Sequence, residues 1–126
     1  LTRLVGSEMC IRDRSNLNKL IDDLDLEDKI TFRSGISEEE IVKTYHNSDI
    51  AVIPSLYEGF GFGAGEAMAC GVPLISTDSG GLKQVIGDAA LKIKPGSVNE
   101  IEDGILKLFT EEKIRQELAE KGRERM

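Results

Sequence analysis

Apolar residues recur at helical spacing near the beginning and near the end of the chain. The first series follows Ser15 with the spacing i, i+3, i+4 and i+7: Leu17, Leu20, Ile21 and Leu24. The second follows Ser97 with the spacing i, i+3, i+7 and i+10: Val98, Ile101, Ile105 and Leu108. Each series predicts an amphipathic helix with a buried apolar face. Capping boxes are predicted at two helix starts: Ser37 with Glu40, for a helix through about His46, and Ser97 with Glu100.

Short apolar runs between these helices are typical of strands. The run DIAVIP (49–54) is continuously apolar, which indicates a strand covered on both faces of a parallel sheet. Further strands are predicted in KITFRSG (Ile30 to Arg33), VPLIST (72–77) and AALKIK (89–94). Further helices are predicted up to Ala69, within GGLKQVI (80–86), and from Glu111 onward. Because strands alternate with helices, the sequence predicts an α/β fold with a Rossmann-like, doubly wound parallel sheet and flanking helices.

Composition excludes several classes of protein. The 126 residues suffice for one domain with a core, and the net charge of -7 argues against a nucleic-acid binder. No apolar run approaches the roughly 18 residues that a membrane-spanning helix needs. The two cysteines, Cys10 and Cys70, show neither metal-site nor disulfide spacing. We therefore expect a reduced, cytoplasmic protein without a transmembrane segment.

The segment EGFGFGAGEAMACG (58–71) places glycine at four alternating positions between two glutamates. It follows a predicted buried strand and precedes a predicted helix, and open parallel sheets bind ligands at this edge. A helix N-terminus offers unpaired N–H groups and a partial positive charge, so an anion such as phosphate would fit there. A tight turn without a ligand is the simpler alternative, although four alternating glycines exceed what a turn needs.

Two other interpretations fit this segment less well. Gly59, Gly61 and Ala64, with Asp78 further on, fit the dinucleotide-binding fingerprint of an NAD(P)-dependent oxidoreductase. However, five residues separate the strand core from Gly59, and the helix that follows is short for a crossover. Two carboxylates could also form a glycosidase pair, but a phosphate cradle between them has no purpose in that reaction.

The segment PSLYEGFGFGAGEAMACGVPLISTDSGG strongly resembles the group-1 glycosyltransferases, also called glycosyltransferase family 4. Every fixed position of their pattern P-S-x-x-E-G-F-G-x-x-x-x-E-A-M-A-x-G-x-P is filled, from Pro54 to Pro73. The resemblance covers residues 15–126. It implies the C-terminal, nucleotide-sugar-binding half of a two-domain retaining glycosyltransferase of the GT-B type, as a fragment without its first strands. The strands at Ile30 and Ile50 would then either pair directly with each other or have unpaired edges.

The resemblance also implies roles for individual residues. Glu58 would be catalytic and would contact hydroxyls of the donor sugar near its reacting carbon. The backbone around it would bind the sugar and the diphosphate: Gly59, Phe60, Gly61 and Phe62. Glu66, in the first turn of the helix, would accept hydrogen bonds from the ribose hydroxyls. A weaker candidate for the base pocket is the segment Gly35, Ile36 and Ser37.

By the same resemblance, no cofactor and no metal would be required, and the partners would be a nucleotide sugar and an acceptor. The acceptor would be a sugar, lipid or polysaccharide bound through the missing N-terminal domain. The full-length enzyme would be cytoplasmic, with a peripheral position at the inner membrane face also in keeping with the family, and the fragment alone would be inactive. A sugar-nucleotide-binding module without catalysis, or an epimerase-like GT-B enzyme, stays an alternative.

Two local features modify this interpretation. Residues 4–14, LVGSEMCIRDR, resemble the in-frame translation of a transposon-end sequencing adaptor, so we expect 1–14 to be an artefact and 15–126 a partial domain. This sequence also differs from the family pattern in three places. Gly63 replaces a usual proline, Phe62 a common leucine, and Lys83-Gln84 a common Pro-Glu. These departures leave the glutamates intact and bear on donor preference.

Overall fold

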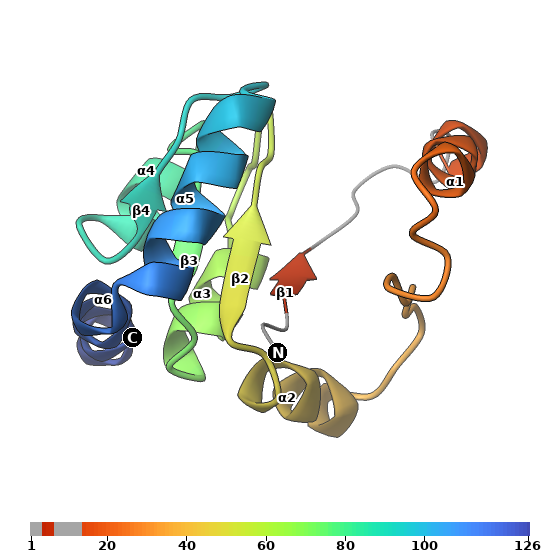
Figure 1. The fold of residues 1–126 in the computed structure, drawn as a ribbon. Coiled ribbons are helices and arrows are strands. Elements are labelled where there is room, and N and C mark those ends of the chain that lie inside the picture. Colours follow the sequence, from red (N-terminus) through yellow and green to blue (C-terminus); the bar gives the residue numbers. More distant parts are fainter. Residues whose placement is uncertain (1–3, 7–13) are drawn as a thin grey trace. The chain divides into compact units, whose positions relative to one another are not determined.

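A four-stranded parallel sheet forms the centre of the larger of two compact units (Figure 1). The computed structural model describes residues 4–6 and 14–126. In the order in which they pair, the strands are β1 (Leu4–Gly6), β2 (Ile50–Ile53), β3 (Leu74–Ser76) and β4 (Leu91–Lys92). All three strand pairs are parallel. The predicted α/β class is confirmed, and so are three of the four predicted strands.

Both faces of the sheet are covered, which explains the continuous apolar runs. Neighbouring side chains of a strand point to opposite faces. Ala51 and Ile53 accordingly belong to one apolar cluster, together with Leu74. Ile50 belongs to a second cluster with Ile75. Each of these five residues is at most 3% exposed, so the central strands are buried on both sides.

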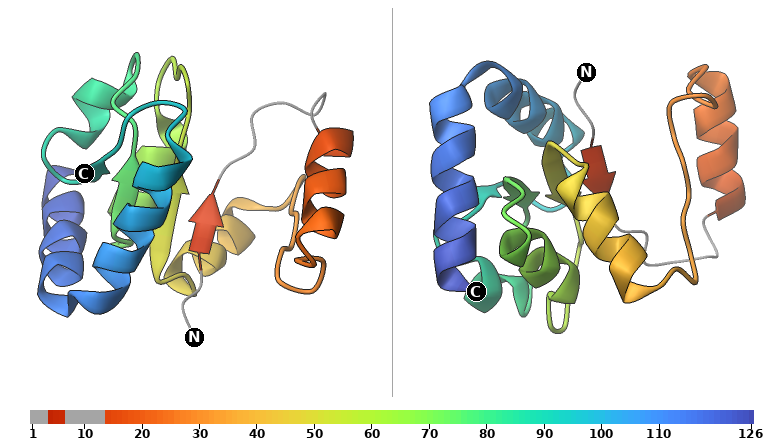
Figure 2. Two further views of the ribbon diagram at one scale, coloured as in Figure 1. Left: turned by 45° about the horizontal axis from the view of Figure 1, so that its top comes forward. Right: turned by 90° about the horizontal axis from the view of Figure 1, so that it is seen from below.

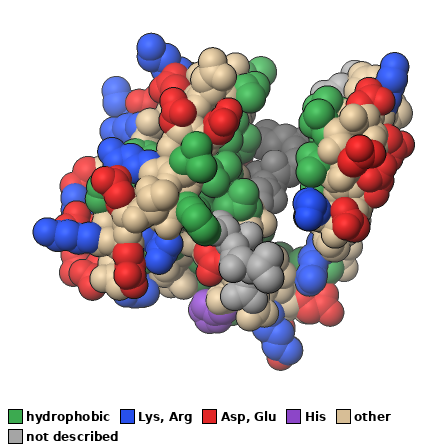
Figure 3. Space-filling view, in the orientation of Figure 1, with side chains coloured by type: hydrophobic (Ala, Val, Ile, Leu, Met, Phe, Trp, Pro, Cys, Tyr) green, Lys and Arg blue, Asp and Glu red, His purple; other side chains and the backbone are tan. Residues whose placement is uncertain are grey.

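Two groups of helices supply the rest of these clusters (Figure 2). The first cluster receives side chains from α2 (Glu38–His46), α3 (Phe62–Ala69) and α4 (Leu82–Ile86). The second receives them from α5 (Val98–Thr110) and α6 (Glu112–Arg125). The later part of α6 also approaches α3, because Gly122 lies against Met68. On the face drawn in Figure 3, acidic and basic side chains are interspersed.

The chain divides into two compact units. The larger contains the sheet and Glu38–Met126, and the smaller lies within Glu8–Ser37. The smaller unit contains α1 (Arg14–Asp23), which confirms the helix predicted from Ser15. After α1 the chain turns at Asp25, a non-glycine residue with a φ of 55°.

Three local predictions were wrong. The strand expected at Ile30 to Arg33 is absent, since the described segment 30–36 has no regular secondary structure. Val98 is 74% exposed and takes no part in the buried face of α5. The capping box of α5 is only half formed. Ser97 Oγ accepts a hydrogen bond from the Glu100 N–H at 3.2 Å, but the Glu100 carboxylate accepts from the Lys94 N–H at 3.3 Å.

One edge of β2 pairs with β1, an arrangement that was not among the two expected. Leu4 pairs with Ile50 and Gly6 with Val52, so β1 extends the sheet by one strand. Val5 packs against the first apolar cluster. Excluding residues 4–6 from the fold was therefore wrong, because this short apolar stretch finds a partner strand. The adaptor origin of residues 1–14 stays a prediction.

Candidate functional site

The glycine-rich loop runs from the carboxyl end of β2 to the start of α3. A second loop, from the end of β3 to α4, lies against it. The Gly81 N–H donates a hydrogen bond to the Glu58 carbonyl oxygen at 2.7 Å, and the Thr77 N–H donates to the Ile53 carbonyl oxygen at 3.2 Å. Loops after neighbouring parallel strands therefore meet at one edge of the sheet, where open α/β sheets bind ligands.

Close approach of these two loops explains Gly80 and Gly81, for which the sequence predicted no ligand contact. A Cβ at Gly81 would collide with the carbonyl oxygen of Gly59. A Cβ at Gly80 would collide with the carbonyl oxygen of Glu58. Of the alternating glycines, Gly61 alone has a positive φ, of 71°. Part of the glycine content thus serves the packing of backbone on backbone.

Glu58 is held by hydrogen bonds to both its backbone and its side chain. Its carboxylate oxygen Oε2 accepts a hydrogen bond from Ser55 Oγ at 3.2 Å. The Ser55 carbonyl in turn accepts one from the hydroxyl of Thr77 at 2.7 Å, and Thr77 is fully buried. With the Gly81 N–H on the Glu58 carbonyl, these bonds fix where this half-buried carboxylate lies. Sequence reasoning missed Ser55 and Thr77, although Ser55 is a fixed position of the motif.

Glu66 is the fifth residue of α3 and lies in its second turn, not in the first as predicted. The reason is that α3 already begins at Phe62. The exposed Glu66 carboxylate lies 3.5 Å from the hydroxyl of Tyr45. Burial, and after it the charge of Glu66, raise the pKa of Tyr45 from 10.0 to about 12. Sequence reasoning had not singled out Tyr45, because its only sequence signal is an aromatic residue on the apolar face of α2.

The N-terminal end of α3 is open to an anion. Gly61 is the N-cap residue, and within the described part of the chain no side chain caps this end. The first N–H groups of a helix have no intrahelical acceptor and carry a partial positive charge. Phe60 and Phe62 flank the cap with exposed rings whose centroids are 5.5 Å apart. The predicted backbone donors thus follow one another at this helix end, although Gly61 itself is buried and Phe60 precedes the N-cap.

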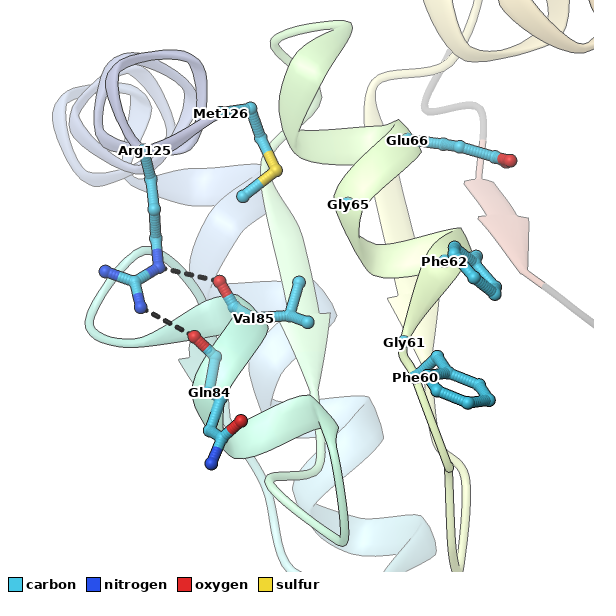
Figure 4. A pocket seen from close by; sticks show the side chains of 9 residues that line it. All are labelled: Phe60, Gly61, Phe62, Gly65, Glu66, Gln84, Val85, Arg125 and Met126. Atoms are coloured by element: carbon cyan, nitrogen blue, oxygen red, sulfur yellow. Dashed lines mark hydrogen bonds between the residues drawn. The ribbon is translucent and has the colours of Figure 1, made fainter.

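An open hollow of about 750 Å³ adjoins this helix end (Figure 4). Its lining comes from the start of α3, from α4 and from the end of α6: Phe60, Gly61, Phe62, Gly65, Glu66, Gln84, Val85, Arg125 and Met126. Arg125 donates hydrogen bonds of 2.6 Å to the carbonyl oxygens of Val85 and Gln84. Figure 4 shows the Glu66 carboxylate pointing away from Arg125. Of the predicted site residues, the lining therefore joins the two phenylalanines, Gly61 and Glu66, but not Glu58.

Other predicted features lie outside this arrangement. Gly35, Ile36 and Ser37 belong to the smaller unit, and their role in a base pocket stays a prediction. Among residues 4–6 and 14–126, no cluster of three or more His, Cys, Asp or Glu side chains could hold a metal ion. Over the same ranges, no helix has the length and apolar character needed to cross a membrane.

The chain belongs to the family Glycosyl transferases group 1, which it matches over residues 4–125. This confirms the resemblance drawn from the motif at Pro54 to Pro73. The match includes β1, and it sets aside the dinucleotide-dependent oxidoreductase, because the chain belongs to a different family.

Related proteins are longer than this chain. It is 36% identical over 110 residues to an MMP α-(1→4)-mannosyltransferase of Mycolicibacterium hassiacum, which covers 85% of the chain and 27% of that protein. It superposes with a TM-score of 0.80 and 29% identity on a sucrose-phosphate synthase of Thermosynechococcus elongatus, over 97% of the chain and 32% of that protein. It also superposes on the C-terminal domain of a glycosyl transferase group 1 family protein of Francisella tularensis. There the TM-score is 0.79 and the identity 28%, over 98% of the chain and 67% of that domain structure. The chain thus has the Rossmann-like α/β fold of part of a GT-B glycosyltransferase, and it spans 27% of the mannosyltransferase and 32% of the synthase.

Proposed function

We propose that the protein to which this chain belongs transfers a sugar from a nucleotide diphosphate to an acceptor hydroxyl, with retention of the anomeric configuration. The observation that carries the proposal is the N-terminal end of α3 at Gly61, which has no side-chain cap and lies between Glu58 and Glu66 in the sequence. Family membership supports the reaction class. Retention and the nucleotide donor are inferred from the motif.

The helix end would bind the donor diphosphate. The N–H groups of Phe60, Gly61 and Phe62 are the candidate donors of hydrogen bonds, because they lie at the positive end of α3 without a side-chain cap. The same groups would stabilise the charge that develops on the leaving diphosphate as the bond to the sugar breaks. We propose that this electrostatic stabilisation needs no metal ion, and that the backbone of Gly59 completes the donor-binding loop.

The two carboxylates would divide the recognition of the donor. Glu58, fixed by Ser55 and by Gly81, would contact hydroxyls of the donor sugar near its reacting carbon. Glu66, one helical turn from Phe62, would accept hydrogen bonds from the ribose. An ionised carboxylate is an acceptor-only group and matches paired hydroxyls of a sugar.

The acceptor would bind through parts of the longer protein, since this chain spans 27% of the mannosyltransferase that it resembles. We therefore propose that the isolated chain binds the donor weakly and does not transfer the sugar. The acceptor would be a sugar, lipid or polysaccharide. The site would operate in the cytoplasm, at the inner membrane face where the acceptor is a lipid.

Steady-state kinetics of a full-length protein containing this domain would test the two roles. Glu58→Gln is expected to lower kcat by roughly 100-fold or more, because it removes a charge next to the reacting carbon. Glu66→Gln is expected to raise KM for the donor with a smaller effect on kcat. Glu102→Gln, on the exposed side of α5, is the matched control and should leave both constants unchanged. Unaltered kinetics in both site variants would contradict the assignment. Intact donor binding without any transfer by the unmodified protein would favour a binding module.

A further inference from the structure

Tyr45 connects the core of the larger unit to the donor site proposed above. It is the penultimate residue of α2, it is only 9% exposed, and its ring belongs to the first apolar cluster. Its hydroxyl, however, lies at the start of α3, 3.3 Å from the carbonyl oxygen of Gly63 and 3.5 Å from Glu66 Oε2. A buried ring thus places a polar tip beside an exposed carboxylate.

The direction of this hydrogen bond follows from its chemistry. The Gly63 carbonyl oxygen and the ionised Glu66 carboxylate can only accept, so the Tyr45 hydroxyl is the donor and shares its one proton between them, at 3.3 and 3.5 Å. Burial and the Glu66 charge raise the pKa of Tyr45 to about 12, so the hydroxyl keeps its proton at neutral pH. The bond uses one of roughly four acceptor positions of the carboxylate, and the others can receive the hydroxyls of a ligand.

An exposed glutamate ordinarily samples several rotamers, and binding must select one of them. A hydrogen-bond donor anchored in the core reduces that cost, because the carboxylate is already oriented before the ligand arrives. The anchor is rigid, since the Tyr45 ring is packed among buried residues of α3 and β2 such as Ala67 and Ile53. The hydroxyl is not crowded by α3, because even a Cβ at Gly63 would lie 3.9 Å from it.

We infer that Tyr45 is a positioning residue that orients Glu66 for recognition of the donor ribose. This inference rests on the proposed function, specifically on the role of Glu66. It adds a residue from α2, 21 positions before Glu66, to a site otherwise built from the loops after β2 and β3. Tyr45 acts through Glu66 and does not itself touch the donor.

The test measures how much more tightly the 126-residue chain binds a nucleotide with the 2′ and 3′ ribose hydroxyls than one without them. Protein-observed NMR, which detects millimolar binding, would follow titrations with ADP, GDP and UDP. The tightest of the three would be compared with its 2′,3′-dideoxy analogue. The ratio of the two dissociation constants is the ribose discrimination. Four proteins are compared: the unmodified chain, Tyr45→Phe, Glu66→Gln and the double variant. Thr110→Val is the control, because it removes a hydroxyl at the exposed end of α5, outside these loops, that bonds only to helix carbonyls among the contacts described.

Tyr45→Phe is expected to lower the ribose discrimination by about two- to fivefold, the effect of losing one modest hydrogen bond. In the Glu66→Gln background it should cause no further loss, and Thr110→Val should change nothing. Equal weakening of both ligands by Tyr45→Phe would overturn the inference, because a merely structural role weakens binding without changing discrimination. Full discrimination in Glu66→Gln, or no binding by the unmodified chain, would overturn the ribose role of Glu66 and the inference that rests on it.

Discussion

The backbone N–H of Gly81 donates a 2.7 Å hydrogen bond to the carbonyl oxygen of Glu58. This bond joins the loop after β3 to the loop after β2, at the residue proposed to contact the donor sugar. It is possible only because Gly81 has no Cβ, since a methyl group there would collide with Gly59. The loop that carries Glu58 is thus hydrogen-bonded to a second loop, which itself carries no proposed catalytic group.

Gly81→Ala should therefore destabilise the protein by about 2 kcal/mol or more, because backbone atoms have to move to admit the methyl group. Gly63→Ala is the matched control on α3. A Cβ at Gly63 would lie 3.5 Å from Ile53, which is ordinary contact, and alanine favours the helix by about 0.5–1 kcal/mol. Denaturant unfolding of both variants measures the difference. Similar stabilities of the two variants would show that the loops do not pack as closely as described.

Ser55→Ala in a full-length protein should lower kcat by about three- to tenfold with little change in KM. The serine hydroxyl donates to the Glu58 carboxylate, and its loss frees that group to leave the orientation that the reacting sugar requires. Ser55→Thr retains a hydroxyl and should restore much of the rate. Ser48→Ala, at the other end of β2, removes a hydroxyl that bonds only to a helix carbonyl among the contacts described, and it serves as control. An effect on KM alone would contradict the positioning of Glu58 by Ser55.

The stability of the larger unit should fall between about pH 10 and pH 12. Tyr45 has its pKa raised from 10.0 to about 12 in the folded state, because burial and Glu66 disfavour the tyrosinate. The unfolded chain loses the proton near pH 10 and the folded chain near pH 12, so the stabilisation present below pH 10 disappears across this interval. Unfolding curves of the unmodified chain and of Tyr45→Phe isolate the contribution. The loss of stability should be smaller in Tyr45→Phe, and identical pH dependences would contradict the account.

Residues 4–6 are expected to contribute to stability even if they prove to derive from an adaptor. Val5→Ala should cost about 1 kcal/mol, because Val5 packs against the first apolar cluster, whereas Leu4→Ala, at a residue 48% exposed, should cost less than about 0.5 kcal/mol. Deleting residues 1–6 should in addition expose the edge of β2 and promote aggregation. Unchanged stability and solubility after the deletion would show that β1 is dispensable.

Sequence patterns predicted the central strands, because a strand that is buried on both faces consists of consecutive apolar residues. The apolar run from Ile50 to Ile53 gave β2, and the run ending at Ser76 gave β3. The prediction failed where an element depends on its partner. Residues 30–33 have a strand-like composition, but a strand needs a neighbour to accept its hydrogen bonds. Leu4–Gly6 is a weaker pattern that does have such a neighbour.

In the candidate site, too, the sequence predicted the residues of a local pattern and missed those that depend on tertiary contacts. The two glutamates and the loop between them were identified from a motif that is contiguous in the sequence. Tyr45 and Thr77 were not, because their hydroxyls reach the site only through tertiary packing. A tyrosine on the apolar face of α2 and a threonine after β3 look like ordinary core residues until the loops that they contact are placed.

The central claim is that a nucleotide sugar binds at the start of α3. It is tested most directly by mapping backbone amide shifts of the 126-residue chain during titration with UDP-, GDP- and ADP-sugars. The account predicts that the largest shifts fall on the amides of Phe60, Gly61 and Phe62, with smaller ones at Glu66. Shifts centred elsewhere in the larger unit, or none with any of the three donors at millimolar concentration, would contradict it.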